Sequence, residues 1–139
     1  MNIIDVHFFI ITDFADVLID CTDFCCNNSF FVMNNKDLKF PDITGKIIGC
    51  AMKVHQFFGQ GFPENIYQRA LIIELEKVGL KCRSEVEKDV YYEEHFIGKR
   101  RLDLIIEDVV LVELKAIAEL DKASYNKIVN YLKVFKIEV

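Results

Sequence analysis

Apolar residues recur at steps of three and four positions in two stretches near the middle of the chain. The first stretch predicts an amphipathic helix over residues 44–57, and its apolar positions are Ile47, Ile48, Ala51, Val54 and Phe58. A second helix is expected over residues 63–78, because Pro63 suits a first helical turn and Gly79 suits a C-terminal cap. Both helices therefore have one face to bury against another element.

Three strand-like stretches follow these helices. Residues 86–93 are rich in Val and Tyr, with Gly98 expected in a turn after them, and residues 101–106 and 109–117 are apolar with Glu107-Asp108 between them. A third helix is expected from Asp121, with Tyr125, Ile128, Val129, Leu132 and Phe135 on its apolar face. Residues 137–139 look like the start of a further strand. The order of elements predicts one α/β unit with a mixed, α+β-type sheet.

The first 32 residues differ from the rest of the chain. They contain no Lys or Arg and five acids, Asp5, Asp13, Asp16, Asp20 and Asp23, which account for the whole net charge of −5. Residues 33–139 are therefore neutral. We interpret residues 1–32 as an N-terminal extension of doubtful structure and residues 33–139 as the functional domain; an ordered strand–turn appendage is the alternative for the extension.

Cysteine usage and hydropathy limit where the protein acts. Five cysteines at irregular spacings give no secretory disulfide framework, which favours a cytoplasmic location. Cys21, Cys25 and Cys26 could form part of a metal clip, but no second ligand pair follows at zinc spacing, and unpaired thiols are the favoured interpretation. No stretch of about 20 largely uncharged apolar residues is present, so no membrane span is expected.

Two charged residues interrupt the apolar stretch at 109–117. Alternation along a strand puts Glu113 and Lys115 on one face, with Val112, Leu114 and Ala116 on the other. Burying a Glu and a Lys there is costly unless that face meets an ion and a charged substrate. The plainer interpretation is a solvated ion pair.

Asp103 is the third candidate, and its place depends on the register of two strands. Asp103 lies opposite Glu113 only if Ile106 pairs with Val110, which leaves residues 107–109 as a three-residue connection. A two-residue turn at Glu107-Asp108 would move Asp103 to the other face. The functional interpretation therefore requires the longer connection or a bulge, although no Gly is present there to make a positive φ easy.

Asp103, Glu113 and Lys115 are residue types that suit metal-dependent phosphodiester chemistry. Two converging carboxylates bind a hard cation such as Mg²⁺ or Mn²⁺. Such a cation polarises a phosphodiester and lowers the pKa of a bound water, and a nearby lysine orients that water or stabilises phosphate charge.

Several blocks of the sequence resemble the GxxExxY protein family, which is placed among PD-(D/E)XK nuclease-like proteins. The signature itself matches residues 61–67, with Gly61, Glu64 and Tyr67 at its fixed positions. The resemblance covers about residues 43–139, and the other matching blocks are Ile47-Ile48-Gly49, Asp103-Leu104, Val112-Glu113-Leu114-Lys115-Ala116 and Asn130-Tyr131-Leu132-Lys133. It implies a core of helix, three strands, helix and strand.

The resemblance also implies roles for individual residues. Asp103 and Glu113 would be metal ligands, with the Leu114 backbone carbonyl as a third, Lys115 the catalytic lysine, and Glu64 the acid contributed by the first core helix. Glu64 and Tyr67 can share one helix face. For Glu64 the alternative is an acid favoured by the helix dipole, and for Tyr67 a half-buried core residue with a wet hydroxyl.

Two departures from the family pattern concern the end of the chain. Lys127 stands where the family often has a Gln one turn before Tyr131, so Lys127 and Tyr131 are supporting candidates only. The chain ends at Val139, so the final strand is expected to be short or missing, which would leave a sheet edge open to self-association.

These observations predict a Mg²⁺-dependent nuclease-like phosphodiesterase acting on DNA or RNA. The alternative is a catalytically inactive domain of the same fold that binds nucleic acid or a protein. The only basic cluster, Lys99-Arg100-Arg101, is small, which points to weak binding or a small target.

Overall fold

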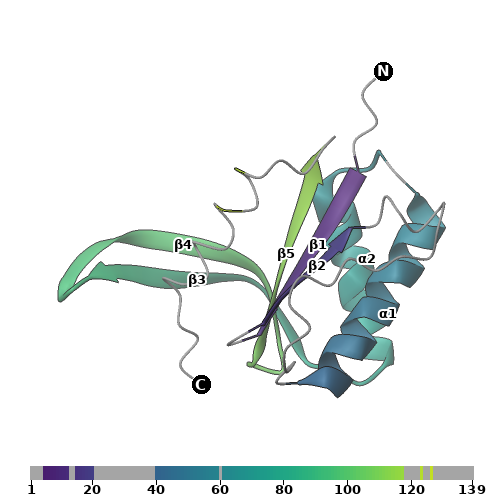
Figure 1. Ribbon diagram of the computed structural model, residues 1–139, viewed down its shortest axis with the longest axis horizontal. Coiled ribbons are helices and arrows are strands. Elements are labelled where there is room, and N and C mark those ends of the chain that lie inside the picture. Colours follow the sequence, from purple (N-terminus) through teal and green to yellow (C-terminus); the bar gives the residue numbers. More distant parts are fainter. Residues whose placement is uncertain are drawn as a thin grey trace.

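The computed structural model describes residues 5–12, 15–20, 40–59 and 61–117, together with Ala123 and Asn126. For residues 5–12, 15–20, 116 and 117 only the backbone is described. The elements run β1 (Asp5–Thr12), β2 (Ala15–Asp20), α1 (Pro41–Phe58), α2 (Glu64–Lys77), β3 (Cys82–Tyr92), β4 (His95–Ile106) and β5 (Val110–Ile117). Figure 1 shows α1 and α2 side by side against the sheet, and a long β3–β4 ribbon that extends away from them.

The two helices begin and end where the sequence signals predict, to within about one turn. Pro41 occupies the first turn of α1, where a missing N–H costs nothing. At the end of α2, Gly79 has φ 79°, the Gly79 N–H bonds the Glu76 carbonyl (3.0 Å) and the Leu80 N–H bonds the Leu75 carbonyl (3.0 Å). This is a Schellman motif, so the predicted Gly79 cap is confirmed.

The five strands form one sheet in the order β2-β1-β5-β4-β3, and every described pairing is antiparallel. The sequence left the N-terminal segment as an extension of doubtful structure or an ordered strand–turn appendage, and within it the structure describes β1 and β2 as an antiparallel pair. β1 pairs with β5 from Asp5↔Ile117 to Ile11↔Leu111. The apolar residues of β1 show no alternation from which the sequence could predict a strand. The backbone of β1 nevertheless supplies hydrogen-bond partners for the backbone of β5. Whether the domain needs this hairpin stays a prediction.

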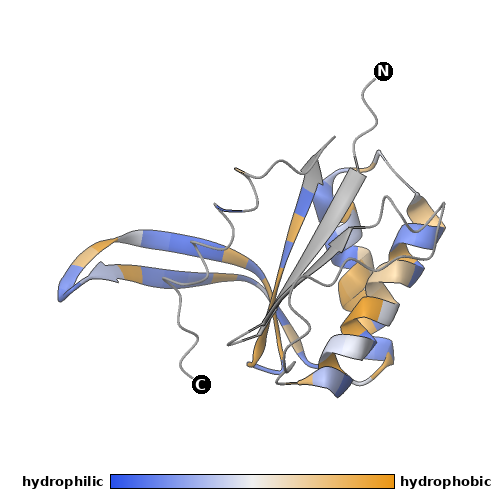
Figure 2. Cartoon of the chain, in the orientation of Figure 1, coloured by the Kyte–Doolittle hydropathy of each residue, from blue (hydrophilic) through white to orange (hydrophobic). Residues whose placement is uncertain are grey.

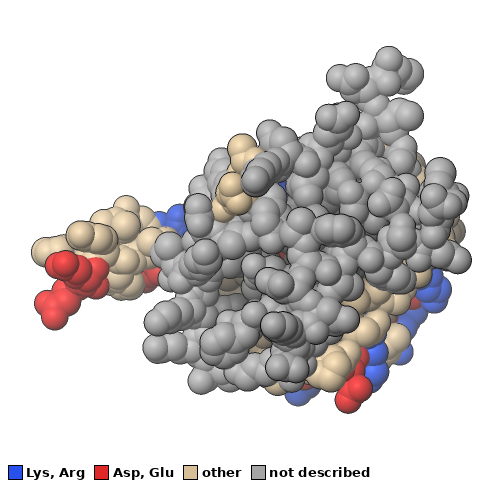
Figure 3. All heavy atoms as spheres, in the orientation of Figure 1, with Lys and Arg blue, Asp and Glu red and all other residues tan. Residues whose placement is uncertain are grey.

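The β3–β4 ribbon is longer than the sequence pattern predicts. Gly98 was expected in a turn, but it lies within β4 opposite Val90, and the turn falls at Glu93-Glu94. The strand register shifts between Val90 and Tyr91. Figure 2 shows hydrophilic residues along much of the projecting part of the ribbon, and Figure 3 shows acidic side chains at its far end.

The main core lies between the helices and one face of the sheet. Buried residues of α1 and α2 pack on alternate residues of β4 and β5: Ile47, Ala51, Val54, Tyr67, Leu71, Leu75, Leu104, Ile106, Val110, Val112 and Leu114. A smaller cluster, made of Leu102, Ile105 and Leu111, lies apart from these residues. The α/β architecture that the element order predicts is therefore confirmed.

Some expectations fall at the edge of the described residues. Of the third helix only Ala123 and Asn126 are described, and both are helical and exposed. Residues 127–139, with the expected final strand, lie outside the described part. Within the described part, no helix combines the length and the apolar character that a membrane span requires.

Candidate active site

The connection between β4 and β5 sets the register on which the candidate site depends. Ile106 pairs with Val110, Ile105 with Leu111 and Leu104 with Val112, so residues 107–109 form the three-residue connection that the site requires. Glu107 and Asp108 have φ 51° and 59°, and the Val109 N–H bonds the Ile106 carbonyl (3.1 Å). The chain thus adopts two left-handed residues without glycine. The predicted register is confirmed, and its continuation by one residue beyond the Leu104↔Val112 pair brings Asp103 level with Glu113.

β4 leaves β5 at Asp103, which opens a fork between the two strands. The β4–β5 ladder ends at Leu104↔Val112, and on the other side of β4 the pairing with β3 skips Glu85, whose φ is 54°. Asp103 therefore lies at a local break in its own strand. Irregular pairing of this kind often re-aims a side chain at a functional site.

Hydrogen bonds with side chains hold Asp103 in place at this break. Its carboxylate Oδ2 accepts the Leu114 N–H (2.8 Å), and its backbone carbonyl accepts the Gln68 Nε2 (3.1 Å). Its backbone also hydrogen-bonds the Glu113 carboxylate. Asp103 is thereby tied to β5 at two residues and to helix α2 at a third.

The hydrogen bond to Leu114 also fixes the direction of the Leu114 carbonyl. In an antiparallel strand, the N–H and C=O of one residue point to the same side, because facing residues exchange both bonds. The Leu114 N–H points towards Asp103, so its carbonyl is directed into the fork as well. This backbone oxygen therefore faces the same side of β5 as the Asp103 carboxylate.

The two sheet faces differ around the fork. Val112 and Leu114 are buried in the main core beneath the helices, so Glu113 and Lys115 project from the other face, as strand alternation predicts. Leu102 packs with Ile105 and Leu111 rather than with Leu104. Alternation along β4 is therefore interrupted at Asp103, and Leu102 lies on the same side of the sheet as Glu113.

Burial and like charge act together on the Glu113 carboxyl. Its side chain is only 5% exposed, and desolvation followed by the nearby Asp103 charge raises the pKa of Glu113 from 4.5 to about 7. Three interactions lower this pKa: the charge of Lys115, the hydrogen bond from the Asp103 backbone, and the charge of Arg100. A cation shared by the two carboxylates would relieve both effects that destabilise the charged form.

The fork offers a donor set that fits Mg²⁺ or Mn²⁺, although it is a small one. Asp103, Glu113 and the Leu114 carbonyl provide oxygen ligands, and Mg²⁺ in particular is often bound by one or two carboxylates while it keeps several waters. Among the described residues, no group of three or more His, Cys, Asp and Glu side chains lies close enough together to hold a metal. The structure therefore brings Asp103 and Glu113 together, but it does not add Glu64 to them as a third ligand.

Helix α2 presents Glu64 and Gln68 along one stripe, four residues apart. Because Gln68 reaches the Asp103 carbonyl, this stripe faces the fork, and Glu64 lies one turn further towards the start of the helix. Sequence reasoning missed Gln68, although its spacing from Glu64 could have identified it.

Tyr67 lies in the core beside the loop that joins α1 to α2. It is fully buried, its hydroxyl donates to the Gly59 carbonyl and accepts the Phe62 N–H, and its ring packs edge-on against Phe58 and Phe62. Tyr67 thus closes the loop between α1 and α2 rather than standing half-buried with a wet hydroxyl. Lys127 and Tyr131 lie outside the described residues.

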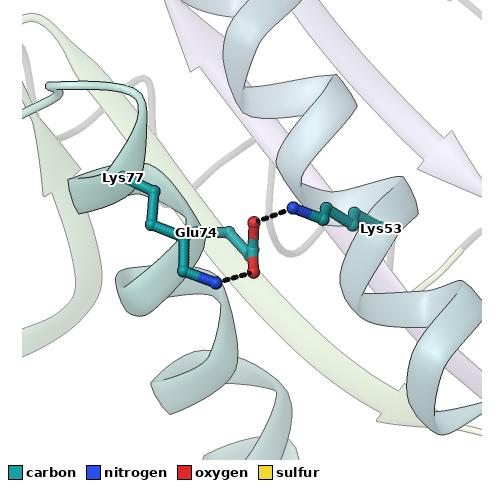
Figure 4. A network of polar contacts seen from close by, with 3 residues as sticks. All are labelled: Lys53, Glu74 and Lys77. Carbon is teal, nitrogen blue, oxygen red and sulfur yellow. Dashed lines mark hydrogen bonds and ion pairs between the residues drawn. The ribbon is translucent and has the colours of Figure 1, made fainter.

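A second polar cluster joins the two helices away from the fork. Glu74 accepts hydrogen bonds from Lys53 of α1 and Lys77 of α2, both at 2.8 Å (Figure 4). These bonds lower the pKa of the Glu74 carboxyl, the Lys53 bond contributing most. Glu74 and Lys53 also line an apolar hollow of about 250 Å³ between the helices, and this cluster holds α1 against α2.

Comparison with known proteins agrees with this geometry. Neither the curated proteins nor the solved structures include a match to the chain. Residues 41–139 match the PD-(D/E)XK nuclease superfamily, a span that includes both helices, the β3–β4 ribbon and the fork. The match covers most of the chain, so the chain belongs to the PD-(D/E)XK nuclease superfamily.

Proposed function

We propose that this protein is a metal-dependent, nuclease-like phosphodiesterase of the GxxExxY type that acts on nucleic acid through Asp103, Glu113 and Lys115. The observation that carries the proposal is the pairing of two carboxylates in the fork between β4 and β5. The Asp103 carboxylate is fixed by the Leu114 N–H, and the Glu113 carboxylate is buried beside it. A structural ion pair would not require two adjacent acids there.

The roles of the residues follow from their places around the fork. Asp103, Glu113 and the Leu114 carbonyl would hold Mg²⁺ or Mn²⁺, which when bound lowers the pKa of a water and polarises the phosphodiester. Lys115 lies on the Glu113 face, where its amine can orient a water or stabilise charge on a phosphate oxygen. Gln68 keeps the Asp103 backbone in position, and Glu64 is placed to contact the substrate or a metal-bound water from helix α2.

The test is metal-dependent cleavage of mixed DNA and RNA substrates by the wild type and by Glu113→Ala. We expect product with Mg²⁺ or Mn²⁺ for the wild type only, and none in a chelator. Glu76→Ala is the matched control, because Glu76 is exposed near the end of α2, and it should cleave like the wild type. Equal background levels of cleavage product from the wild type and from Glu113→Ala would reject the proposed enzymatic activity.

Calorimetric titration separates the enzyme from a catalytically inactive domain of the same fold. The proposed site predicts a Mg²⁺ or Mn²⁺ binding isotherm that Glu113→Ala abolishes. Absence of metal binding together with retained nucleic-acid or protein binding would favour the inactive interaction domain. We also propose a cytoplasmic location, which the free thiols of Cys50 and Cys82 support.

A further inference from the structure

The exposed apolar side chains gather at two places on the molecule. Among the described residues, eight large hydrophobic side chains are exposed, and six of them belong to these two places. Two of the six, Phe57 and Ile73, line the hollow between α1 and α2. The other four lie at the far end of the β3–β4 ribbon, residues 91–97, which we call the ribbon tip: Tyr91, Tyr92, Phe96 and Ile97. Exposed apolar side chains that are clustered rather than scattered mark an interaction surface.

The hollow has the size and the lining to receive an aromatic ring. It measures about 250 Å³, whereas a cavity of about 150 Å³ is already large enough to hold benzene. Phe57, which is 82% exposed, leaves most of its ring in water beside this hollow. The apolar lining comes from both helices: Val54, Phe57 and Phe58 of α1, and Ala70 and Ile73 of α2.

The ribbon tip presents aromatic rings next to two acids. Tyr91 and Phe96 are directly paired across the two strands, and their rings meet edge to face with their centroids 5.8 Å apart. Glu93 and Glu94 form the turn beside these rings, and both are exposed. Acidic side chains are visible at this end of the ribbon in Figure 3. The tip is therefore an apolar projection that carries two negative charges.

The rim of the hollow carries the opposite charge. Glu74 is bonded to both Lys53 and Lys77 at 2.8 Å, so its charge cancels only one of the two lysines (Figure 4). More than half of each lysine side chain stays exposed. The acidic tip and the basic rim are thus complementary, and complementary charges select and orient a partner more than they add affinity.

Both halves of this match belong to one chain, but they cannot meet within it. Figure 1 shows the far end of the β3–β4 ribbon and the two helices on opposite sides of the molecule. β4 runs as one strand from the ribbon into the sheet, which holds the tip away from the helices. A second copy of the chain carries the surface that each half needs.

We propose that two copies of this protein exchange ribbons, with the tip of each copy docked in the α1–α2 hollow of the other. The Tyr91–Phe96 ring pair fills the hollow, and the two turn acids lie near the lysines of the rim. The assembly is a closed two-fold dimer that uses the same two surfaces twice. It is distinct from association through an open sheet edge, and it goes beyond the proposed phosphodiesterase function without depending on it.

The apolar area at the two surfaces favours a reciprocal exchange over a single contact. Complete burial of the exposed parts of the six side chains removes roughly 700 Å² from water per contact, at about 200 Å² for a whole aromatic side chain. Stable complexes bury about 1,200 to 2,000 Å² in total. One contact falls short of this range, whereas two contacts reach about 1,400 Å².

Reversal of charge on each surface in turn tests the exchange. Glu93→Lys/Glu94→Lys changes the tip, and Ile73→Glu puts an acid into the hollow. Analytical ultracentrifugation of the full chain measures the dimer dissociation constant of each variant. Each variant alone should dimerise roughly tenfold more weakly than the wild type or worse, because both contacts of its dimer lose their complementary charge.

An equal mixture of the two variants gives the sharper result. In their heterodimer, one contact joins the unchanged tip to the unchanged hollow, and the other joins the reversed tip to the altered hollow. The mixture should therefore dimerise roughly tenfold more tightly than either variant alone, or better. The control is Asn65→Glu, which adds the same charge to an exposed position of α2 outside the hollow and should dimerise like the wild type.

Removal of the rings tests the apolar part of the contact at constant charge. Tyr91→Ser/Phe96→Ser should weaken the dimer roughly tenfold or more, because aromatic side chains carry most of the affinity in such a contact. The control is Val78→Ser, which removes an exposed apolar side chain outside both surfaces and should change the dissociation constant less than about threefold. Melting curves establish that each variant is folded before its dimerisation is compared.

A wild type that stays monomeric up to about 100 µM would leave the hollow to a different protein and overturn the proposal. Dimerisation of the charge-reversed variants at the wild-type level, or a mixture that associates no better than its components, would overturn it as well. Assemblies that grow beyond two copies would reject the closed exchange. None of these measurements uses metal or nucleic acid, so failure of the proposed function leaves them unaffected. A longer ribbon turn would remove this contact and leave the fork in place.

Discussion

Replacement of Glu113 by Gln should make the protein more stable in the absence of metal. The carboxyl is buried beside Asp103, and its pKa rises from 4.5 to about 7 in the folded state. Between these two values, the folded protein keeps a proton that the unfolded chain has lost, so stability falls as pH rises through this window. At 1.36 kcal/mol per pKa unit, the charged carboxyl costs roughly 3 kcal/mol above pH 7. Gln has the same shape and carries no charge.

Urea unfolding in a chelator measures this cost. At about pH 8, the unfolding free energy of Glu113→Gln should exceed that of the wild type by about 2 to 3 kcal/mol. The gain is smaller than the full cost of the charge because the amide makes weaker hydrogen bonds than the carboxylate. At about pH 5 the difference should fall below about 1 kcal/mol, since the wild-type carboxyl is then largely protonated. Glu94→Gln, in the exposed ribbon turn, is the control and should show no such pH dependence.

The reasoning fails if Glu113→Gln is no more stable than the wild type at high pH, or if the gain is the same at both pH values. Metal should reverse the ranking. A cation that binds only the folded protein stabilises it by mass action, so Mg²⁺ or Mn²⁺ should raise the melting temperature of the wild type and leave that of Glu113→Gln unchanged.

Three further predictions concern the surroundings of the site. Gln68→Ala should lower the unfolding free energy in urea by about 1 kcal/mol and slow metal-dependent cleavage, because it frees the Asp103 carbonyl; unchanged cleavage would mean that Gln68 does not position Asp103. Glu74→Gln should lower the melting temperature at neutral pH, because the lowered pKa of Glu74 means that its charged carboxylate stabilises the fold. The difference in melting temperature from the wild type should disappear as pH falls below about 4.5, and a difference that stays constant would contradict this prediction. Removal of residues 1–32 should expose the β5 edge and reduce the melting temperature and solubility. If the shortened protein keeps both properties, the domain begins near Met33.

The sequence was most informative where the candidate site residues and the strand register had to agree with each other. Alternation placed Glu113 and Lys115 on one face, and the need for Asp103 to meet Glu113 selected the Ile106–Val110 pairing. The turn residues alone argued against this register, because residues 107–109 contain no Gly. In the structure Glu107 and Asp108 take positive φ nonetheless. The Glu107 side chain accepts the Lys81 N–H, and that bond helps to hold the conformation.

The sequence was less informative where neither face of a strand is buried. Gly98 was expected in a turn, but the backbone there pairs with β3, and the neighbouring Lys99 and Arg101 side chains are exposed on the projecting ribbon. No alternation of polar and apolar residues marks such a ribbon. The break at Asp103 was also hidden, because it depends on Gln68 and Glu113, which meet Asp103 only in the folded chain.

The connection at residues 107–109 has a consequence for how this chain can diverge. Substitutions there change local strain and contacts of the turn, such as the bond from the Lys81 N–H to Glu107. Gain or loss of one residue would instead exchange the two faces of β4 relative to β5 and separate Asp103 from Glu113. The Glu93-Glu94 turn at the far end of the ribbon carries no such restriction, since it can lengthen without moving the fork. Among relatives that keep the acid pair, insertions and deletions should therefore collect at the ribbon tip and be missing from residues 107–109.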